Sequence, residues 1–150
     1  MEQRVLIIGA CGQIGTELTL KLRDKYGTSN VVASDLKEGT PQLMTSGLFI
    51  KIDATDKEQI RNILVEFNIT QVYMMAAMLS ATAEKMPLRA WDLNMTALLT
   101  ILELGKEGLY KQLFWPSSIG AFGPNSPHTN TPQDTIMAPT TVYGISKYSG

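Results

Sequence analysis

Short apolar runs alternate regularly with amphipathic segments along this chain of 150 residues. The first run, Val5–Ile8, is wholly apolar, which is typical of a strand buried on both faces of a sheet. A helix is predicted from Gln13 to Tyr26, with an apolar stripe of Ile14, Leu18 and Leu22. Strands that alternate with helices predict a parallel sheet covered on both faces. We therefore predict an α/β fold with a doubly wound parallel sheet.

The remaining elements continue this alternation. Thr55 and Glu58 have the spacing of a capping box, which predicts a helix start ahead of Ile60. Residues 37–47 and the proline-bearing residues 124–139 are predicted to be loops. Further strands are predicted at Val31–Ser34, Leu48–Ile52, Val72–Ala77 and Leu113–Trp115, and further helices at Leu88–Gly108, with Trp91, Met95, Leu98 and Leu102 on one side, and from Thr140 or Thr141 onwards.

Composition excludes several classes of function. Hydrophobic residues make up 44% and charged residues 18% of the chain, which fits a globular domain. The formal net charge is −1 and the charges are interspersed, so we expect neither nucleic acid nor a membrane surface as a partner. The longest apolar runs are too short to cross a bilayer. A single cysteine cannot form an internal disulfide and fits a reducing compartment, so we expect a cytoplasmic protein.

A glycine-rich segment, "GACGQIG", follows the first predicted strand and opens the first predicted helix. It holds Gly9, Gly12 and Gly15. In a dinucleotide site one glycine makes the tight turn, one lets the backbone approach the pyrophosphate, and one allows close packing of helix on strand. The N-terminus of the helix would direct its N–H groups at the phosphates. The spacing alone is weak evidence, but its place between strand and helix favours a nucleotide site over a simple flexible turn.

Two aspartates end the next two predicted strands. Asp35 lies twenty residues after Gly15, where a carboxylate accepts hydrogen bonds from an adenosine ribose and repels a 2′-phosphate. This position favours NAD over NADP as the cofactor, although Lys37 nearby softens the discrimination. Asp53 ends the third strand, where it either accepts from the adenine amino group or simply flanks the following helix.

A tyrosine and a lysine stand one helical turn apart in "VYGISK". On a helix, Tyr143 and Lys147 share a face. A tyrosine hydroxyl titrates near ~10 in model peptides, and a neighbouring ammonium group lowers that pKa toward the range of a useful base. Ser117 and Ser118, directly after the fifth predicted strand, supply hydroxyls that can hold a reacting oxygen. Each feature alone is common on solvated helices and turns.

Together these features resemble the extended short-chain dehydrogenase/reductase superfamily, whose members have a Rossmann fold. The segments "IIGACGQIGTEL", "MAAMLSATAEK", "AWDLNM", "FWPSSIGAFGP", "NTPQ" and "TTVYGISK" are similar to those of its NAD-dependent L-threonine 3-dehydrogenases. The resemblance covers the chain from about Val5 to Lys147. It implies oxidation of the 3-hydroxyl of L-threonine to 2-amino-3-ketobutyrate, with hydride transfer to NAD.

The resemblance also implies a role for individual residues. Tyr143 would be the base, Lys147 would assist it and bind the nicotinamide ribose, and Ser118 would hydrogen-bond the reacting hydroxyl. Ser80 and Ser117, with Ser118 and Tyr143, would contact the substrate. The residues implied to bind NAD are Gly9, Cys11, Gly12, Gln13, Ile14, Gly15, Asp35, Leu36, Asp53, Ala54, Ala76, Ala77, Asn94, Tyr143 and Lys147.

Members of this family continue with further C-terminal strands and a substrate domain. We therefore expect residues 1–150 to be an incomplete NAD-binding domain that lacks these parts and is inactive alone. The complete protein is expected to be a homodimer that pairs through the long helix and the Tyr143/Lys147 helix. A nucleotide-sugar epimerase or dehydratase of the same superfamily and a non-catalytic NAD-binding fragment stay open as alternatives.

No metal site is expected. Metal-dependent alcohol dehydrogenases need a cluster of cysteine and histidine ligands, and this sequence has one of each, Cys11 and His128. Cys11 is interpreted as a small filler within the glycine loop, and His128 as a solvated residue of the proline-bearing loop.

Overall fold

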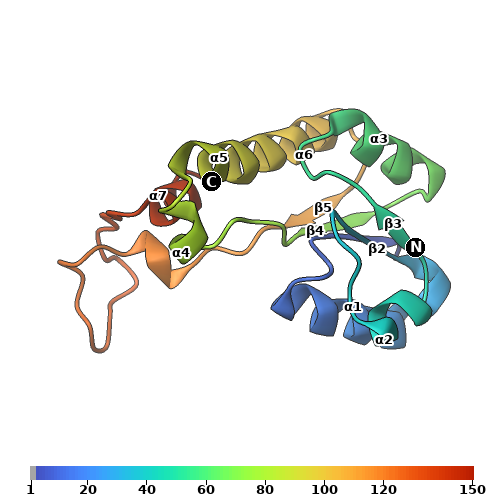
Figure 1. Ribbon diagram of the computed structural model, residues 1–150, viewed down its shortest axis with the longest axis horizontal. Coiled ribbons are helices and arrows are strands. Elements are labelled where there is room, and N and C mark those ends of the chain that lie inside the picture. Colours follow the sequence, from blue (N-terminus) through green and yellow to red (C-terminus); the bar gives the residue numbers. More distant parts are fainter. Residues whose placement is uncertain (1–2) are drawn as a thin grey trace. The chain divides into compact units, whose positions relative to one another are not determined.

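A computed structural model describes residues 3–150, which divide into two compact units (Figure 1). Unit 1 consists of the described residues up to Ala76 together with Ala97–Pro116. Unit 2 consists of Ala77–Thr96 and Ser117–Gly150. The predicted glycine loop and strand-end aspartates therefore belong to unit 1, and the predicted Ser118, Tyr143 and Lys147 belong to unit 2.

Unit 1 is built on a parallel sheet whose strands follow the order β3-β2-β1-β4-β5. Val5 of the central strand pairs in register with Val31 on one side and Gln71 on the other. The predicted doubly wound parallel sheet is confirmed, and each predicted strand is present within a few residues. The strands are β1 (Val5–Ile8), β2 (Val31–Asp35), β3 (Phe49–Lys51), β4 (Gln71–Met74) and β5 (Gln112–Phe114).

Helices cover both faces of this sheet. Figure 1 shows α1 (Gln13–Tyr26) and α2 (Pro41–Thr45) on one face, and α3 (Lys57–Glu66) and α6 (Ala97–Lys106) on the other. A short 3-10 turn, η1 (Thr28–Asn30), links α1 to β2. The sheet and the helices α1 and α2 enclose an apolar core. Its buried members are Val5, Ile7, Ala10, Leu22, Val31, Ala33 and Leu43.

The bounds of α1 are as predicted, and two residues of its predicted apolar stripe, Leu18 and Leu22, pack on the core, but Ile14 does not. Ile14 is 65% exposed, whereas Gly15, Thr19 and Leu22 are buried. A helix that begins at the mouth of a sheet has its first turn beyond the strand ends, so an apolar side chain there has nothing to pack on. Gly27, with φ of +88°, ends the helix by adopting a conformation that other residues rarely take.

Two local predictions in unit 1 were wrong. Residues 37–47 contain the short helix α2, which starts because Thr40 accepts a hydrogen bond from Leu43 N–H and Pro41 fits the first helical position. The predicted capping box of Thr55 is replaced by Asp56, whose carboxylate accepts from the N–H groups of Glu58 and Gln59. Two adjacent residues could each cap this helix, and sequence spacing alone did not separate them.

Unit 2 consists of short helices and a long loop. Its elements are α4 (Ser80–Ala83), α5 (Pro87–Trp91), the π-helical turn η2 (Asp92–Thr96), the 3-10 turn η3 (Ile119–Ala121) and α7 (Val142–Ser149). The predicted loop at 124–139 is confirmed, and so is a helix capped by Thr141. Sequence reasoning did not predict α4.

The helix predicted at Leu88–Gly108 is interrupted by the π-helical turn. A π turn holds an extra residue, so it rotates the residues that follow onto a different face. Of the residues predicted on one apolar stripe, Leu98 is buried, whereas Trp91 and Leu102 are 43% and 46% exposed. The buried residues of this stretch are Ala90, Asn94, Ala97, Leu98, Thr100, Ile101 and Leu104.

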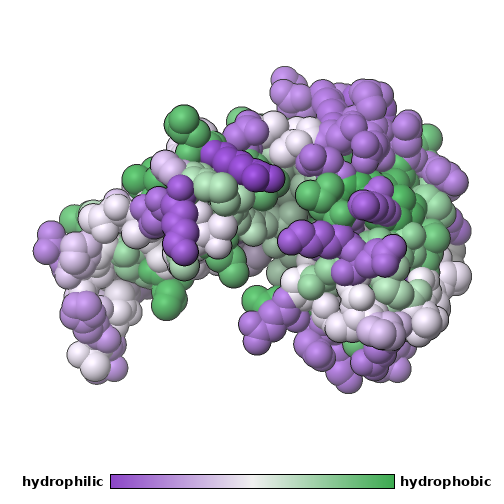
Figure 2. All heavy atoms as spheres, in the orientation of Figure 1, coloured by the Kyte–Doolittle hydropathy of each residue, from purple (hydrophilic) through white to green (hydrophobic). Residues whose placement is uncertain are grey.

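The outer surface of α3 and α6 carries a group of ion pairs. Lys57 contacts Glu103 at 2.8 Å, and both Lys57 and Arg61 contact Glu107. Figure 2 shows the hydrophilic side chains that gather over these helices. In the part of the chain that the structure describes, no helix has the length and apolar character needed to span a membrane.

Candidate functional site

The glycine loop of unit 1 is shaped by backbone contacts that leave no room for side chains at two of its glycines. Gly9 has φ of +91°, and a Cβ added there would lie 2.4 Å from the Ala76 nitrogen. A Cβ added at Gly15 would lie 2.2 Å from the Gly9 carbonyl oxygen. These glycines make the tight turn and the close helix–strand packing that the sequence predicted for them.

Gly12 differs from its two neighbours because it faces open space. A Cβ added there would meet a single atom, the Gly9 carbonyl oxygen, at 3.6 Å, which is an ordinary contact. Gly12 is also the N-cap of α1, and no side chain caps this end of the helix. The N-terminus of α1, with its positive dipole end, is therefore reached at Gly12 without a side chain in the way, which fits a pyrophosphate. Gln13 and Ile14, both exposed, form the first turn of the same helix.

Asp35 is held in place by the glycine loop itself. Its Oδ2 accepts from the N–H of Cys11 at 2.9 Å, and its Oδ1 accepts from the N–H of Lys37 at 3.2 Å. Each carboxylate oxygen has two acceptor positions, so both retain capacity for a ribose hydroxyl. Leu36, next in the chain, is 53% exposed. This arrangement fits the ribose role predicted for Asp35.

Cys11 is a poor nucleophile in this setting. Burial, assisted by the charge of Asp35 and a hydrogen bond to it, raises the pKa of the Cys11 thiol to about 11. Its Sγ donates to the Lys37 carbonyl at 3.1 Å. A thiol with so high a pKa stays protonated at neutral pH. The geometry therefore favours the interpretation of Cys11 as a packing residue.

Asp53 follows β3 and is exposed. Its Oδ1 accepts from both the N–H and the hydroxyl of Thr55, at 2.9 and 2.7 Å, and these bonds lower the pKa of the Asp53 carboxyl. Asp53 thus orders its own turn, as the plainer of the two sequence interpretations expected, and its contact with adenine stays a prediction. Its neighbour Ala54 is buried, at 8% exposure.

In unit 2 the structure brings Ser118 and Tyr143 together around Gly120. A Cβ added at Gly120 would lie 3.3 Å from Cδ1 of Tyr143 and 3.4 Å from Oγ of Ser118. Both side chains therefore touch the same small space from opposite ends of the sequence segment 118–143. The Oγ of Ser118 also accepts from Gly120 N–H at 3.1 Å, which fixes its direction.

Lys147 lies one turn along α7 from Tyr143, as predicted. Its Nζ is 6.0 Å from the centroid of the Tyr143 ring. Lys147 is 6% exposed, and burial lowers its pKa to about 8. A cation buried beside a tyrosine is costly for folding, and such groups are concentrated at functional sites.

The first turn of α7 is held tightly against η3. The hydroxyl of Thr141 accepts from Gly144 N–H at 3.0 Å. A Cβ added at Gly144 would lie 2.1 Å from the Gly120 carbonyl oxygen, so only glycine allows this approach. Gly144 is therefore needed for this packing, and a Cβ at Gly120 would be in tight contact with Tyr143 and Ser118. Sequence reasoning missed both glycines. Their signal was present as the glycines of "SSIGAFG" and "VYGISK".

Asn94, on the π-helical turn, joins two segments of unit 2. Its amide oxygen accepts from Met78 N–H at 2.8 Å, and its amide nitrogen donates to the Met78 carbonyl and to Ser146 Oγ, at 3.3 and 3.2 Å. Ser146 Oγ in turn donates to the Tyr143 carbonyl at 2.8 Å. The Asn94 amide groups therefore bind the protein itself, and contact of this residue with NAD stays a prediction.

The other predicted residues lie at the ends of strands or helices. The N–H of Ala76, just past β4, donates to the Ile8 carbonyl at 2.9 Å, and Ala77 follows it as a partly exposed residue. Ser80 begins α4 and is exposed, and Ser117 is exposed beside Ser118. These side chains are accessible to a ligand.

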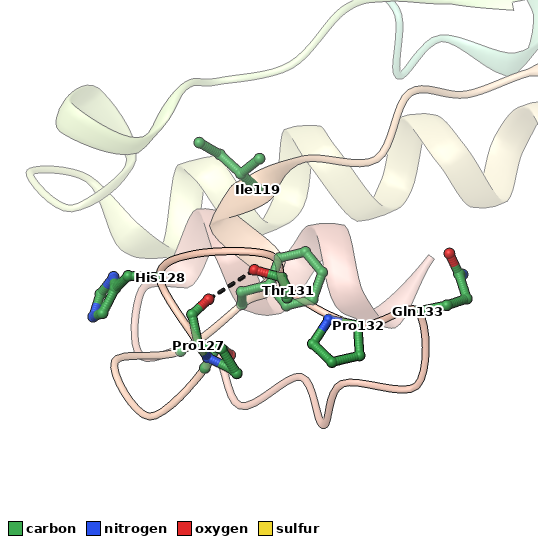
Figure 3. Close-up of a pocket in the computed structure, with 9 residues that line it drawn as sticks. Ile119, Pro127, His128, Thr131, Pro132 and Gln133 are labelled. Carbon is green, nitrogen blue, oxygen red and sulfur yellow. Dashed lines mark hydrogen bonds between the residues drawn. The ribbon is translucent and has the colours of Figure 1, made fainter.

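A separate hollow lies within the proline-bearing loop of unit 2 (Figure 3). Its volume is about 580 Å³, and a hydrogen bond from the Thr131 hydroxyl to the Pro127 carbonyl, 2.7 Å long, braces one wall. The hollow is lined by Ile119, Phe122, Gly123, Ser126, Pro127, His128, Thr131, Pro132 and Gln133. Among residues 3–150, no three side chains of His, Cys, Asp or Glu gather closely enough to hold a metal ion.

A parallel sheet with a glycine turn after its first strand defines a nucleotide-cofactor-binding protein of the Rossmann class. The role of Ser118, Tyr143 and Lys147 in acid–base chemistry stays a prediction. The chain belongs to the NAD dependent epimerase/dehydratase family, whose model matches residues 5–150. The family description names NAD, the predicted cofactor.

Curated relatives carry the same family name. The chain is 49% identical over 150 residues to an uncharacterized epimerase/dehydratase of Staphylococcus saprophyticus. It is 46% identical over 149 residues to an uncharacterized epimerase/dehydratase of Staphylococcus aureus. The chain spans 46% of the length of each relative.

Solved structures are similar throughout the described chain. The L-threonine dehydrogenase of Clostridium difficile is 49% identical with a TM-score of 0.93, over 99% of this chain and 47% of that one. The holo form of the L-threonine dehydrogenase of Cupriavidus necator is also 49% identical, with a TM-score of 0.90, over 95% and 46%. The UDP-glucose 4-epimerase of Thermotoga maritima is 28% identical with a TM-score of 0.87, over 98% and 48%. The predicted resemblance to threonine dehydrogenases is confirmed.

Proposed function

We propose that this chain carries the NAD site and the acid–base residues of an L-threonine 3-dehydrogenase. The observation that carries the proposal is the cluster in which Ser118 and Tyr143 meet around Gly120, with buried Lys147 one turn away. A protein that only bound NAD would not need these three side chains together. The 49% identity to two threonine dehydrogenases supports threonine as the substrate.

Unit 1 would hold the adenosine and pyrophosphate parts of NAD. The open face of Gly12 and the uncapped N-terminus of α1 would receive the phosphates, and Asp35 would accept from the ribose hydroxyls. Cys11, Gln13, Ile14, Leu36, Asp53, Ala54 and Ala76 would line this part of the site. When bound, NAD supplies an acceptor for the hydrogen and electron pair that leave C3 of threonine.

The residues of unit 2 would manage the proton of the same alcohol. Tyr143 Oη would take the proton from the 3-hydroxyl, and Ser118 Oγ would hold the reacting oxygen in line. A Lys147 pKa of about 8 leaves its ammonium mostly charged at pH 7, where it would stabilise the negative charge of the tyrosine. Ser80 and Ser117 would contact the amino-acid part of the substrate. The product would be 2-amino-3-ketobutyrate.

A nucleotide-sugar epimerase is the second candidate. The same Ser, Tyr and Lys set would serve that reaction, and a UDP-glucose 4-epimerase is similar in structure at a TM-score of 0.87. The identity of 28% to this epimerase, against 49% to the threonine dehydrogenases, favours threonine.

We also propose a homodimer that pairs through α7 and the helical stretch formed by α5, η2 and α6. Large apolar side chains on these helices support it, because Leu99 and Tyr148 are 54% and 53% exposed. The mass of the purified protein in solution, measured by light scattering, tests this part of the proposal. A monomer at micromolar concentration would contradict it.

The reaction is tested with the longest natural polypeptide that contains this sequence, beside residues 1–150 alone. NADH formation from L-threonine is followed by absorbance, with UDP-glucose as the competing substrate. We expect NADH from threonine and a loss of at least 100-fold in kcat for Tyr143→Phe, since the base is then absent. Conversion of UDP-glucose without NADH release would favour the epimerase, and no reaction with either would leave an NAD-binding module.

A further inference from the structure

A carboxylate from a distant part of unit 2 caps the helix that carries Tyr143. The Oε1 of Glu84 accepts from the N–H of Val142 at 2.7 Å, across 58 residues of sequence. Val142 is the first residue of α7, so its N–H has no partner within the helix. Glu84 belongs to the "LSATAEK" segment, in which the proposed reaction already uses Ser80.

Two caps from different segments thus enclose Tyr143. Glu84 accepts from the N–H of Val142, just before the tyrosine, and Thr141 accepts from the N–H of Gly144, just after it. A carboxylate at a helix N-terminus also interacts favourably with the helix dipole. Because Gly144 in turn packs on the Gly120 carbonyl, the backbone of Tyr143 is fixed from three directions.

Glu84 also ends α4. Its own N–H donates to the Ser80 carbonyl at 3.0 Å, and Ala83 beside it is fully buried. The side chain of Glu84 therefore connects the helix that begins at Ser80 to the helix that carries Tyr143. In the proposed reaction Ser80 and Tyr143 contact the same molecule of threonine. Its carboxylate carbon and its reacting carbon, C3, are separated by one carbon, so the two residues must be placed precisely.

We propose that Glu84 is a positioning residue, which sets Tyr143 relative to Ser80 by bonding Val142 N–H. The inference rests on the proposed function of Tyr143 as base. Glu84 acts through the backbone of α7 and does not itself exchange a proton. A small displacement of a reacting group lowers the reaction rate strongly. Loss of this hydrogen bond is therefore expected to lower kcat more than it lowers the affinity for NAD.

The test uses three variants of the longest natural polypeptide that contains the sequence. Glu84→Ala removes the acceptor, and Glu84→Gln keeps an acceptor oxygen at the same place without the charge. Glu66→Ala, at the exposed end of α3, is a matched control for loss of a surface carboxylate. The readouts are kcat, KM for NAD, and amide hydrogen exchange of the peptide covering 140–149, measured by mass spectrometry.

For Glu84→Ala we expect kcat to fall about tenfold, with KM for NAD within twofold of wild type. Exchange in residues 140–149 is expected to rise about fivefold, the usual effect of losing a helix cap. Glu84→Gln should restore kcat to about half of wild type, and Glu66→Ala should change neither readout.

The outcomes separate the inference from the function on which it rests. Unchanged exchange in Glu84→Ala would show that the bond does not hold α7, and faster exchange with unchanged kcat would show a purely structural bond. Either result overturns the inference while wild-type turnover of threonine still supports the proposed function. If wild type instead converts UDP-glucose, the same kcat ratios are measured on that substrate. If wild type converts neither, the proposed function and the inference fall together.

Discussion

The glycine loop of unit 1 and the Tyr143 helix of unit 2 position their functional groups in opposite ways. The loop presents backbone, and its shape follows from two glycines that no other residue can replace without meeting main-chain atoms. The Tyr143 helix presents side chains, and their positions depend on contacts from residues far away in sequence, including Glu84, Asn94 and Gly120. A site made of backbone groups therefore depends on nearby residues and can be predicted from their spacing in the sequence. A site made of side chains is assembled by tertiary contacts.

The largest effect is expected at Gly144. The Cβ of Gly144→Ala would lie 2.1 Å from the Gly120 carbonyl oxygen and 2.9 Å from Cβ of Pro139. The first turn of α7 must then shift, so kcat is expected to fall at least about 100-fold, while Kd for NAD changes less than about tenfold. Kinetics and fluorescence titration with NADH measure the two effects.

Ser149→Ala, at an exposed position of the same helix, is the control for Gly144→Ala and should keep near wild-type turnover. Retention of more than half of wild-type kcat by Gly144→Ala would show that the side-chain site tolerates movement of its helix. The contrast between the two regions would then be lost.

An effect that is no larger but more selective is expected at Gly12. Gly12→Ala meets only an ordinary contact at 3.6 Å, so the thermal midpoint should stay within about 2 °C of wild type. Affinity for NAD is expected to fall about 100-fold, because the methyl group occupies the face proposed for the pyrophosphate. Calorimetric titration and thermal unfolding test this.

Gly15→Ala is the comparison for Gly12→Ala. Its affinity for NAD and its thermal midpoint should both fall, since its Cβ would lie 2.2 Å from the Gly9 carbonyl oxygen.

The smallest effect concerns the stability cost of Lys147. Burial lowers its pKa from 10.5 to about 8, so between these values the unfolded chain binds more protons and wild-type stability rises with pH. Lys147→Met removes this dependence. The variant should be more stable than wild type by about 1–3 kcal/mol at pH 7, and the difference should shrink toward pH 10. Urea unfolding at several pH values measures it, and parallel pH profiles for the two proteins would contradict the buried charge.

Local patterns predicted unit 1 well because its elements are set by local chemistry. A wholly apolar run predicted β1, and the apolar period from Gln13 to Tyr26 predicted the bounds of α1, since each depends on residues within a few positions. The π-helical turn at Asp92–Thr96 was not predictable in this way. It interrupts the regular helical spacing on which the predicted stripe of Leu88–Gly108 was based, and Trp91 and Leu102 of that stripe are exposed.

The site divides along the same line. Tyr143 and Lys147 could be paired from their spacing because both lie on one helix. Ser118 and Tyr143 both lie beside Gly120, where a Cβ would be in tight contact with each, and a glycine has no reactive side chain that sequence reasoning could select. The cap from Glu84 spans 58 residues and leaves no periodic pattern.

The carboxylate of Asp35 has a consequence for cofactor engineering. One of its oxygens accepts from the main chain of the glycine loop at Cys11, so the residue that would select the ribose also braces the turn that would receive the phosphates. A designer who replaces Asp35 with alanine to admit NADP would loosen the phosphate cradle at the same time. Asparagine keeps an acceptor oxygen at the same distance from the main chain for Cys11 N–H, and a search for NADP-using variants should begin from it.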